Sequence, residues 1–183
     1  YNWVIDPLDG TTNFIHGIPT YCVSIALLKN KELVVGAIYE PNQDEMFCAW
    51  KNGGAYLNEI RISVSTTEKI SDALLATGFP YYDYKRLDGY MNILKWLMHN
   101  SRGVRRIGSA AIDLAYVACG RFDAFYEYSL NPWDVAAGAI IVNEAGGSVK
   151  DFNGGKDYLF NKEIVASNLH IESELLNIIK SSF

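Results

Sequence analysis

The chain has 183 residues, 49% of them hydrophobic and 20% charged, which excludes a disordered chain and allows a sizeable core. Sixteen basic and twenty-one acidic residues give a net charge of −5. This balance argues against nucleic acid and anionic membranes as partners but leaves small phosphorylated substrates open. No apolar run reaches the ~18 residues of a membrane helix, and three scattered cysteines favour a reducing, cytoplasmic compartment.

The first third of the chain has the pattern of β-structure. A short buried strand is expected at Trp3–Ile5. Polar tetrapeptides then separate two pairs of apolar runs. Hairpins are therefore predicted for Val23–Leu28 with Leu33–Tyr39 and for Met46–Trp50 with Ala55–Leu57. We expect these strands to form a sheet-rich subdomain over residues 1–70.

Strands alternate with helices in the rest of the chain. Apolar residues at helical spacing predict a helix over residues 87–98, and capping residues predict two more over 109–118 and 131–146. Strands are predicted at Leu74–Thr77, Phe122–Tyr126 and Ile164–Ala166, and a final helix at Glu172–Lys180. This alternation predicts an α/β subdomain over residues 71–183.

The sharpest chemical signal lies directly after the first predicted strand. Asp6 and Asp9 are three residues apart, and Pro7 stiffens the loop between them. The two carboxylates and the carbonyl of Leu8 can therefore converge, and such hard oxygen donors are the ligands that Mg²⁺ prefers. A plain surface turn explains the same residues equally well, because Asp, Pro and Gly are common in turns.

The next residues add a possible anion site. Gly10 lets the backbone approach a ligand closely. If a helix begins at Gly10 and Thr11, its free amide groups would face an anion beside the metal. One loop would then hold both a cation and a phosphate.

A second acidic position opens the predicted helix over residues 131–146. Asn131 and Pro132 are typical of a helix start, which places Asp134 at the third helical position. Asp134 can be a further metal ligand delivered from a rigid helix end. By itself this position favours a simpler interpretation, an acid that caps the first turn.

A third group of residues can face a polar ligand. Gly108, Ser109 and Ala110 stand at a predicted helix start, and Glu127 follows a predicted strand. Backbone amides at the helix start and the Glu127 carboxylate could bind substrate hydroxyls. A helix cap and an exposed charge are the simpler alternative. The three histidines are scattered, and the motifs of serine hydrolases, zinc proteases and P-loop proteins are absent.

Taken together, these residues resemble the inositol monophosphatase family of metal-dependent phosphatases. Trp3–Phe14 resembles the first signature of the family, and Trp133–Gly147 resembles the second. The resemblance implies an α/β fold, a layered α-β-α-β-α sandwich of the inositol monophosphatase type, and a homodimer. It also implies Mg²⁺-dependent hydrolysis of a phosphomonoester, with inhibition by Li⁺.

The resemblance also implies a role for each site residue. The metal ligands would be Asp6, the Leu8 carbonyl, Asp9 and Asp134, so that residues 1–70 would be the remainder of a metal-binding subdomain. Thr11 would orient the attacking water. The remaining implied contacts are to substrate: phosphate for the amides of Gly10 and Thr11, and the hydroxyl-bearing part for Gly108, Ser109, Ala110, Glu127 and Asp134.

One departure from the family pattern concerns the start of the chain. Family members carry an acidic motif upstream of the first signature, and its Glu binds metal and helps to activate the water. Nothing precedes Tyr1 in this sequence. We therefore expect the N-terminal part of the sandwich to be missing and the 183-residue chain by itself to be inactive.

The favoured reaction is the hydrolysis of myo-inositol 1-phosphate to inositol and phosphate. The partner would thus be a small phosphorylated polyol, with no nucleic acid and no membrane. A related sugar phosphate, histidinol phosphate or a 3′-phosphonucleotide is the alternative substrate. A regulatory homologue with impaired catalysis is the alternative of another class.

Overall fold

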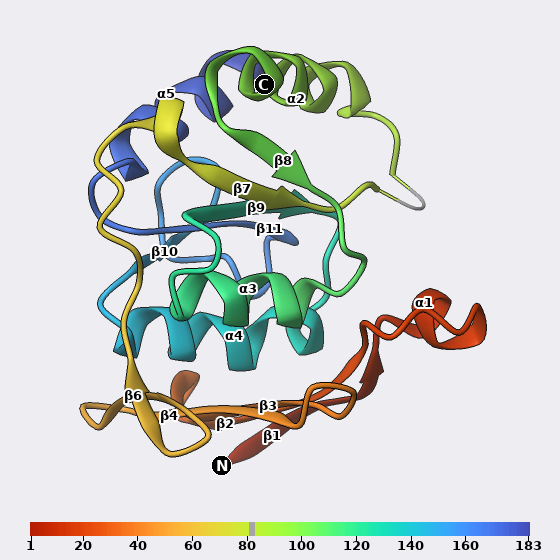
Figure 1. Cartoon of the computed structure of the whole chain (residues 1–183), viewed down its shortest axis with the longest axis vertical. Coiled ribbons are helices and arrows are strands. Elements are labelled where there is room, and N and C mark those ends of the chain that lie inside the picture. The colour runs from red at the N-terminus through yellow and green to blue at the C-terminus, as the bar shows by residue number, and fades with distance from the viewer. Residues whose placement is uncertain (81–82) are drawn as a thin grey trace.

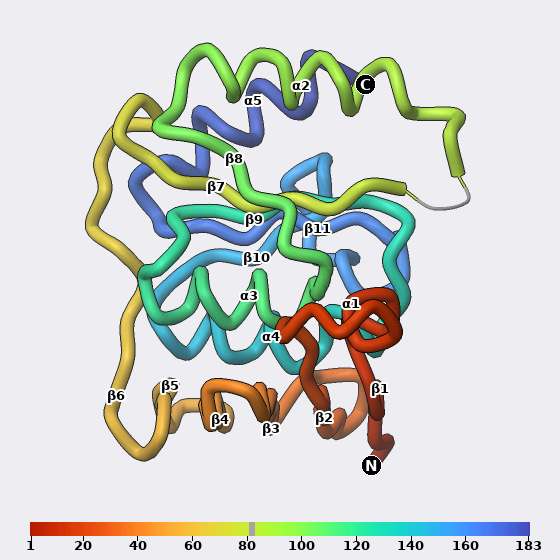
Figure 2. The backbone as a smooth tube through the Cα atoms, turned by 45° about the vertical axis from the view of Figure 1, so that its right-hand side comes forward, coloured from red at the N-terminus to blue at the C-terminus, as the bar shows by residue number. Residues whose placement is uncertain are grey.

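The computed structural model describes residues 1–80 and 83–183, and these residues form four stacked layers (Figure 1). A first sheet, a layer of two helices, a second sheet and an outer layer of two helices follow one another. The N-terminus lies at the first sheet and the C-terminus in the outer helical layer (Figure 2). The helices are α1 (Thr11–Ile15), α2 (Leu87–Asn100), α3 (Ala110–Ala118), α4 (Pro132–Glu144) and α5 (Glu172–Ser182), with a 3-10 turn η1 (Ile70–Asp72).

The first sheet is an antiparallel meander in the order β1-β2-β3-β4-β5-β6. Its β2–β3 hairpin closes through Asn30 and Lys31, whose φ angles of 52° and 68° suit a two-residue turn that follows the twist of the strands. The strands are β1 (Asn2–Asp9), β2 (Cys22–Lys29), β3 (Glu32–Glu40), β4 (Glu45–Trp50), β5 (Gly54–Leu57) and β6 (Ile60–Ile62).

The second sheet is mixed. Its order is β10-β11-β9-β7-β8, with β7 parallel to both of its neighbours and the remaining pairs antiparallel. Every residue of β9 and of β11 is buried, as expected for central strands covered by helices on both faces. The strands are β7 (Leu74–Thr77), β8 (Gly103–Arg105), β9 (Ala124–Tyr128), β10 (Ser148–Lys150) and β11 (Glu163–Ser167).

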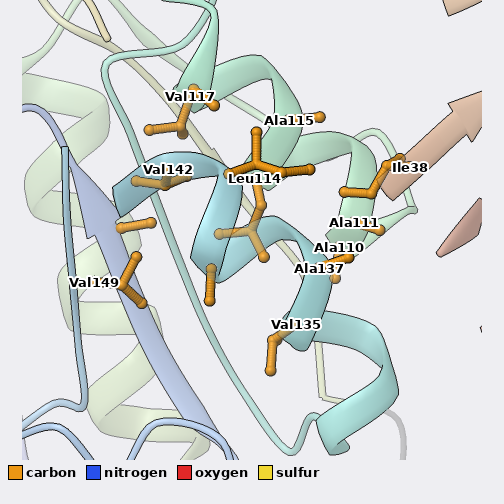
Figure 3. Packing of buried hydrophobic residues seen from close by; sticks show 14 of the residues in the cluster. Ile38, Ala110, Ala111, Leu114, Ala115, Val117, Val135, Ala137, Val142 and Val149 are labelled. Atoms are coloured by element: carbon orange, nitrogen blue, oxygen red, sulfur yellow. The ribbon is translucent and has the colours of Figure 1, made fainter. Parts of the chain in front are cut away.

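The main core lies around α3 and α4, between the two sheets. Figure 3 shows side chains such as Leu114 of α3 and Val142 of α4 within this layer. Small residues let the backbones approach: a Cβ on Gly36 of β3 would lie 2.7 Å from the carbonyl oxygen of Ala137, and one on Gly138 would meet Leu114. The position of α4, which carries Asp134, therefore depends on its close packing against the first sheet.

The outer layer consists of amphipathic helices. Tyr90, Ile93 and Leu97 of α2 are fully buried against the second sheet, as is Leu175 of α5. The predicted final helix is thus confirmed. Among the described residues, no helix has the length and apolar character needed to cross a bilayer.

Three features of the fold differ from the sequence prediction. The first strand is an exposed edge strand and not a buried one: Trp3 and Ile5 are more than half exposed, because in the described part of the chain no helix covers that face of the sheet (Figure 1). The strand predicted at residues 122–126 begins two residues later, since the Asp123 side chain accepts hydrogen bonds from Ser65 and from the Leu74 amide. The short strands β6, β8 and β10 were not predicted.

The layered α/β class is confirmed by this arrangement. The division of the chain into subdomains over residues 1–70 and 71–183 remains a prediction.

Candidate active site

The two carboxylates of the first motif are brought together by a bulge in an edge strand. Asp6 pairs with Ser24 and Asp9 with Cys22, so β1 uses one residue more than β2 between these two points. Side chains alternate along a regular strand, and residues three apart would point to opposite faces. The extra residue re-aims the strand, and carboxylate oxygens of Asp6 and Asp9 lie within 4.8 Å of each other.

Local hydrogen bonds fix the bulged end of β1 that carries these acids. The Leu8 amide donates to Oδ1 of Asp6 (3.0 Å), and the Thr11 hydroxyl donates to the Leu8 carbonyl (2.8 Å). Gly10 has a φ of 85°, and a Cβ there would lie 2.9 Å from the Thr20 carbonyl oxygen. Only glycine fits this position without strain, and the predicted helix start follows directly as α1.

Asp9 joins the first motif to the start of α3. Its Oδ2 accepts hydrogen bonds from the Ser109 hydroxyl (2.6 Å) and from the Ala111 amide (2.8 Å). Burial raises the pKa of Asp9 to about 6, although both hydrogen bonds favour its charged form. A buried carboxylate of this kind is stabilised by a nearby positive charge.

Asp134 reaches the same point from the start of α4. Its Oδ2 accepts a hydrogen bond from the Asn131 amide (2.7 Å) in a capping box, and burial raises its pKa. One oxygen of Asp134 lies within 4.8 Å of oxygens of both Asp6 and Asp9. Capping and metal binding are therefore compatible, because a carboxylate has lone pairs for both.

These three acids fit a hard divalent cation. They offer only oxygen donors, come from rigid elements, and crowd negative charge into a partly buried place. In addition, Asp6 and Asp134 each raise the pKa of Asp9 through their negative charges. A bound cation would remove that mutual repulsion.

A hollow of about 220 Å³ opens beside the three acids. Asp6 does not line the hollow, but its carboxylate is clustered with those of Asp9 and Asp134, which do. Leu8, Gly10 and Thr11 do not line the hollow either. The predicted site residues that do line the hollow come from four segments of the chain: Asp9, Gly108, Ser109, Ala110, Glu127 and Asp134.

Glu127 is buried and not an exposed charge, so the simpler alternative for this residue was wrong. It belongs to β9, and its carboxylate lies over Gly78, where an added Cβ would come within 2.0 Å of Oε2. Burial, followed by the charge of Asp9, raises the pKa of Glu127 to about 8. The absence of a side chain at Gly78 therefore determines where this carboxylate can stand.

Sequence reasoning missed three contributors to the site. Asn13 donates hydrogen bonds to the carbonyls of Thr20 and Ile107, both at 2.8 Å, and so attaches α1 to the segment before α3 (Figure 2). Gly78 makes room for Glu127, and Asp113 lines the hollow from α3. Asp113 could have been found from the sequence, since it is an acid within an otherwise apolar helix.

The fold and the acid cluster define a layered α/β protein with a candidate metal centre, and comparisons with known proteins agree. The sequence profile of the inositol monophosphatase family matches residues 1–182. The inositol-1-monophosphatase of Mesorhizobium japonicum is 45% identical over 180 residues, which cover 98% of this chain and 68% of that protein. The Nus factor SuhB of Pseudomonas aeruginosa is 48% identical over 182 residues, covering 98% and 67%.

A solved structure has the same fold. The extragenic suppressor protein suhB from Bartonella henselae superimposes with a TM-score of 0.95 at 45% identity, over 100% of this chain and 71% of that one. The chain therefore belongs to the inositol monophosphatase family, a family of metal-dependent phosphatases. The prediction that nucleic acid is no partner stays a prediction.

Proposed function

We propose that the protein hydrolyses a phosphomonoester with Mg²⁺ as cofactor, and that its preferred substrate is myo-inositol 1-phosphate. The observation that carries the proposal is the convergence of Asp6, Asp9 and Asp134 beside a polar hollow. Family membership supports the reaction class. The metal, the substrate and the role of each residue are part of the proposal.

The ligands assigned to the metal are the carboxylates of Asp6, Asp9 and Asp134 and the Leu8 carbonyl. A magnesium ion held there would supply charge neutralisation and would make a bound water more acidic. The Leu8 carbonyl already accepts a hydrogen bond from the Thr11 hydroxyl, and its second lone pair would be available to the metal. The Thr11 oxygen keeps lone pairs that can accept a hydrogen bond from water, which fits its assigned role in orienting the nucleophile.

The remaining residues are assigned to the substrate. The amides of Gly10 and Thr11 bind the phosphate. The segment Gly108–Ala110 and the Glu127 carboxylate are assigned to the hydroxyl-bearing leaving group, because they line the hollow together with Asp9 and Asp134. A sugar phosphate, histidinol phosphate or a 3′-phosphonucleotide would use the same metal centre and differ only in this second group of contacts.

A second function is suggested by relatives of similar identity. Proteins named Nus factor SuhB are 47% and 48% identical to this chain. A regulatory role of that kind would use the surface of the protein and does not require the acid cluster. A cytoplasmic location, a homodimer and sensitivity to Li⁺ are further parts of the proposal.

Phosphate release from myo-inositol 1-phosphate by the full-length protein tests the proposal. Turnover is expected with Mg²⁺ and is expected to disappear with a chelator and to return on re-addition. The same assay with histidinol phosphate and a 3′-phosphonucleotide ranks the alternative substrates. Turnover that is indifferent to the chelator would contradict the metal assignment, and no turnover of any ester would favour the regulatory role.

A further inference from the structure

Two buried acids lie in the hollow beyond the proposed metal ligands. Asp113 is 1% exposed and Glu127 is 8% exposed, and both line the hollow together with Asp9 and Asp134. Within the described residues, Oδ1 of Asp113 is enclosed and has no hydrogen-bond partner. An acceptor of this kind is costly to bury, because it loses its bonds to water and gains none in return.

Other buried acids of the chain are satisfied. Asp123 accepts hydrogen bonds from the Leu74 amide (2.7 Å) and from Ser65 (2.5 Å). Asp151 accepts from the amides of three residues of its own loop, and Glu163 pairs with Arg86. Buried polar atoms without a partner are uncommon. The contrast marks Asp113 as a buried acid for which the described residues supply no partner to one oxygen, and a ligand in the hollow can supply it.

The position of Asp113 on α3 explains why it faces the hollow. Ser109 is the N-cap of α3, and its carbonyl accepts a hydrogen bond from the Asp113 amide (3.0 Å), so Asp113 lies one turn into the helix. The Ser109 hydroxyl donates a hydrogen bond to Asp9, and both Ser109 and Asp113 line the hollow. The other faces of α3 are apolar and pack in the core.

The chemistry of the missing partner follows from the charges around the hollow. Asp9 and Asp134 belong to the proposed metal centre. Burial raises the pKa of both Asp113 and Glu127, and Arg106, which also lines the hollow, opposes this rise by favouring their charged forms. Two buried carboxyl groups therefore remain in the hollow, and a group that can both donate and accept hydrogen bonds satisfies them in either protonation form. Hydroxyl groups of a polyol do both, whereas a second anionic group can only accept.

We propose that Asp113 is a specificity-determining residue of the substrate hollow: together with Glu127 it forms hydrogen bonds with hydroxyl groups of the polyol part of a phosphate ester. This inference rests on the proposed phosphatase function and adds the residue that recognises the leaving group. The phosphate end of the ester would lie at the acid cluster, and the hydroxyl-bearing end would lie against α3 and β9.

The test compares Asp113→Asn with the unsubstituted full-length protein on three kinds of ester. These are myo-inositol 1-phosphate, its analogues that each lack one hydroxyl, and p-nitrophenyl phosphate. Loss of one charged hydrogen bond is expected to lower kcat/KM for the inositol ester by roughly tenfold to a hundredfold, mainly through KM. Turnover of p-nitrophenyl phosphate is expected to change less than about threefold, because this ester offers no hydroxyl to Asp113.

The deoxy analogues locate the contact. The analogue that lacks the hydroxyl bound by Asp113 is expected to be a poor substrate for the unsubstituted protein. The Asp113→Asn variant is expected to use this analogue with the same kcat/KM as the unsubstituted protein, because the contact is already lost, as in a double-mutant cycle. Asp123→Asn is the matched control, since Asp123 is buried and satisfied away from the hollow. It is expected to lower the melting temperature without changing the preference among esters. Asp113→Asn is expected to leave the melting temperature unchanged or to raise it.

The outcomes separate this inference from the proposed function. An equal loss on all esters, or a lower melting temperature with unchanged preference, would make Asp113 a structural residue and overturn the inference. An unsubstituted protein without turnover would overturn the proposed function instead. Calorimetric titration with unphosphorylated myo-inositol then tests the role of Asp113 without any turnover. The inference predicts weaker binding by Asp113→Asn than by the unsubstituted protein, and equal binding or no binding by both would contradict it. Asp113→Ser replaces Asp113→Asn if the latter does not fold.

Discussion

The two groups of acids in this protein differ in how they are held. Asp6, Asp9 and Asp134 each accept at least one hydrogen bond from a backbone amide. Asp113 and Glu127 line the same hollow, yet the enclosed oxygen of Asp113 has no partner in the described structure, and burial and neighbouring charges shift the pKa of Glu127. The first group has a fixed geometry, and the second has free acceptor capacity.

This difference distinguishes two chemical tasks. A divalent cation requires ligands at set positions, and backbone hydrogen bonds hold them there. Recognition of a hydroxyl requires an acceptor that is unsatisfied until the ligand arrives, because the unpaired acceptor then discriminates against esters that lack the hydroxyl. Substitutions in the first group should therefore affect all substrates alike, and substitutions in the second should affect them selectively.

The largest effect is expected for Asp9→Asn. Asp9 is the acid that connects the first motif to α3, and the amide would remove a negative charge from the proposed metal centre. Activity on every phosphomonoester should fall by about a hundredfold to a thousandfold. Steady-state kinetics at several Mg²⁺ concentrations check this prediction. Asp72→Asn, in an exposed ion pair with Arg102, is the control. Near-normal turnover of Asp9→Asn would contradict the metal assignment.

Glu127→Gln should have the next largest effect, and it should be selective. The carboxylate is buried in the hollow and is proposed to bind a substrate hydroxyl. We expect kcat/KM for myo-inositol 1-phosphate to fall by roughly tenfold to a hundredfold, and that for p-nitrophenyl phosphate to change far less. The check is to measure kcat/KM for both esters with Glu127→Gln and with the unsubstituted protein. Equal losses would place Glu127 in the metal centre or in the fold.

Gly78→Ala should reproduce part of the Glu127 effect without changing any charge. A Cβ at residue 78 would lie 2.0 Å from Oε2 of Glu127 and must displace that carboxylate. Use of the inositol ester should fall by about tenfold, the lower end of the range for one charged hydrogen bond. The double variant with Glu127→Gln should be little worse than Glu127→Gln alone. Full additivity of the two losses would show that Gly78 acts by another route.

The smallest expected effect is on the pH dependence of stability. Burial raises the pKa of Glu127 from 4.5 to about 8, so the folded protein retains a proton that the unfolded chain releases. This contribution to stability is complete below pH 4.5 and is lost as the pH rises through about 8. The melting temperature of each protein is measured at pH 5.5 and at pH 8.5 without divalent cations. The fall between these two values should be roughly 5 °C larger for the unsubstituted protein than for Glu127→Gln. Parallel curves would contradict the prediction.

Much of the fold could be predicted from local patterns. The caps at Ser109 and Asn131 and the apolar spacing of residues 87–98 predicted helices close to their observed bounds. The three-residue strands β6, β8 and β10 carry too few residues for a period to be visible. The exposure of Trp3 and Ile5 depends on which face of the sheet is covered, and an apolar pattern cannot show this.

The candidate site was predictable where its residues are close in sequence and less so elsewhere. Asp6 and Asp9 stand in one motif, and the structure places them with Asp134 in one cluster, as the prediction of a shared site requires. Asp113 and Gly78 matter only because α3, β9 and the end of β7 meet at the hollow. No local pattern relates these residues, so the structure was needed to show their contact.

The bond from the Ala111 amide to Asp9 joins residues that are 102 positions apart in the chain. Contacts of such long sequence separation form only after extensive loop closure, which is slow. We therefore expect the acid cluster to be completed at a late stage of folding, when the first sheet docks on the helical layer. A cation that binds only the completed cluster stabilises the native state more than the folding transition state. Magnesium should consequently slow unfolding and leave the folding rate almost unchanged.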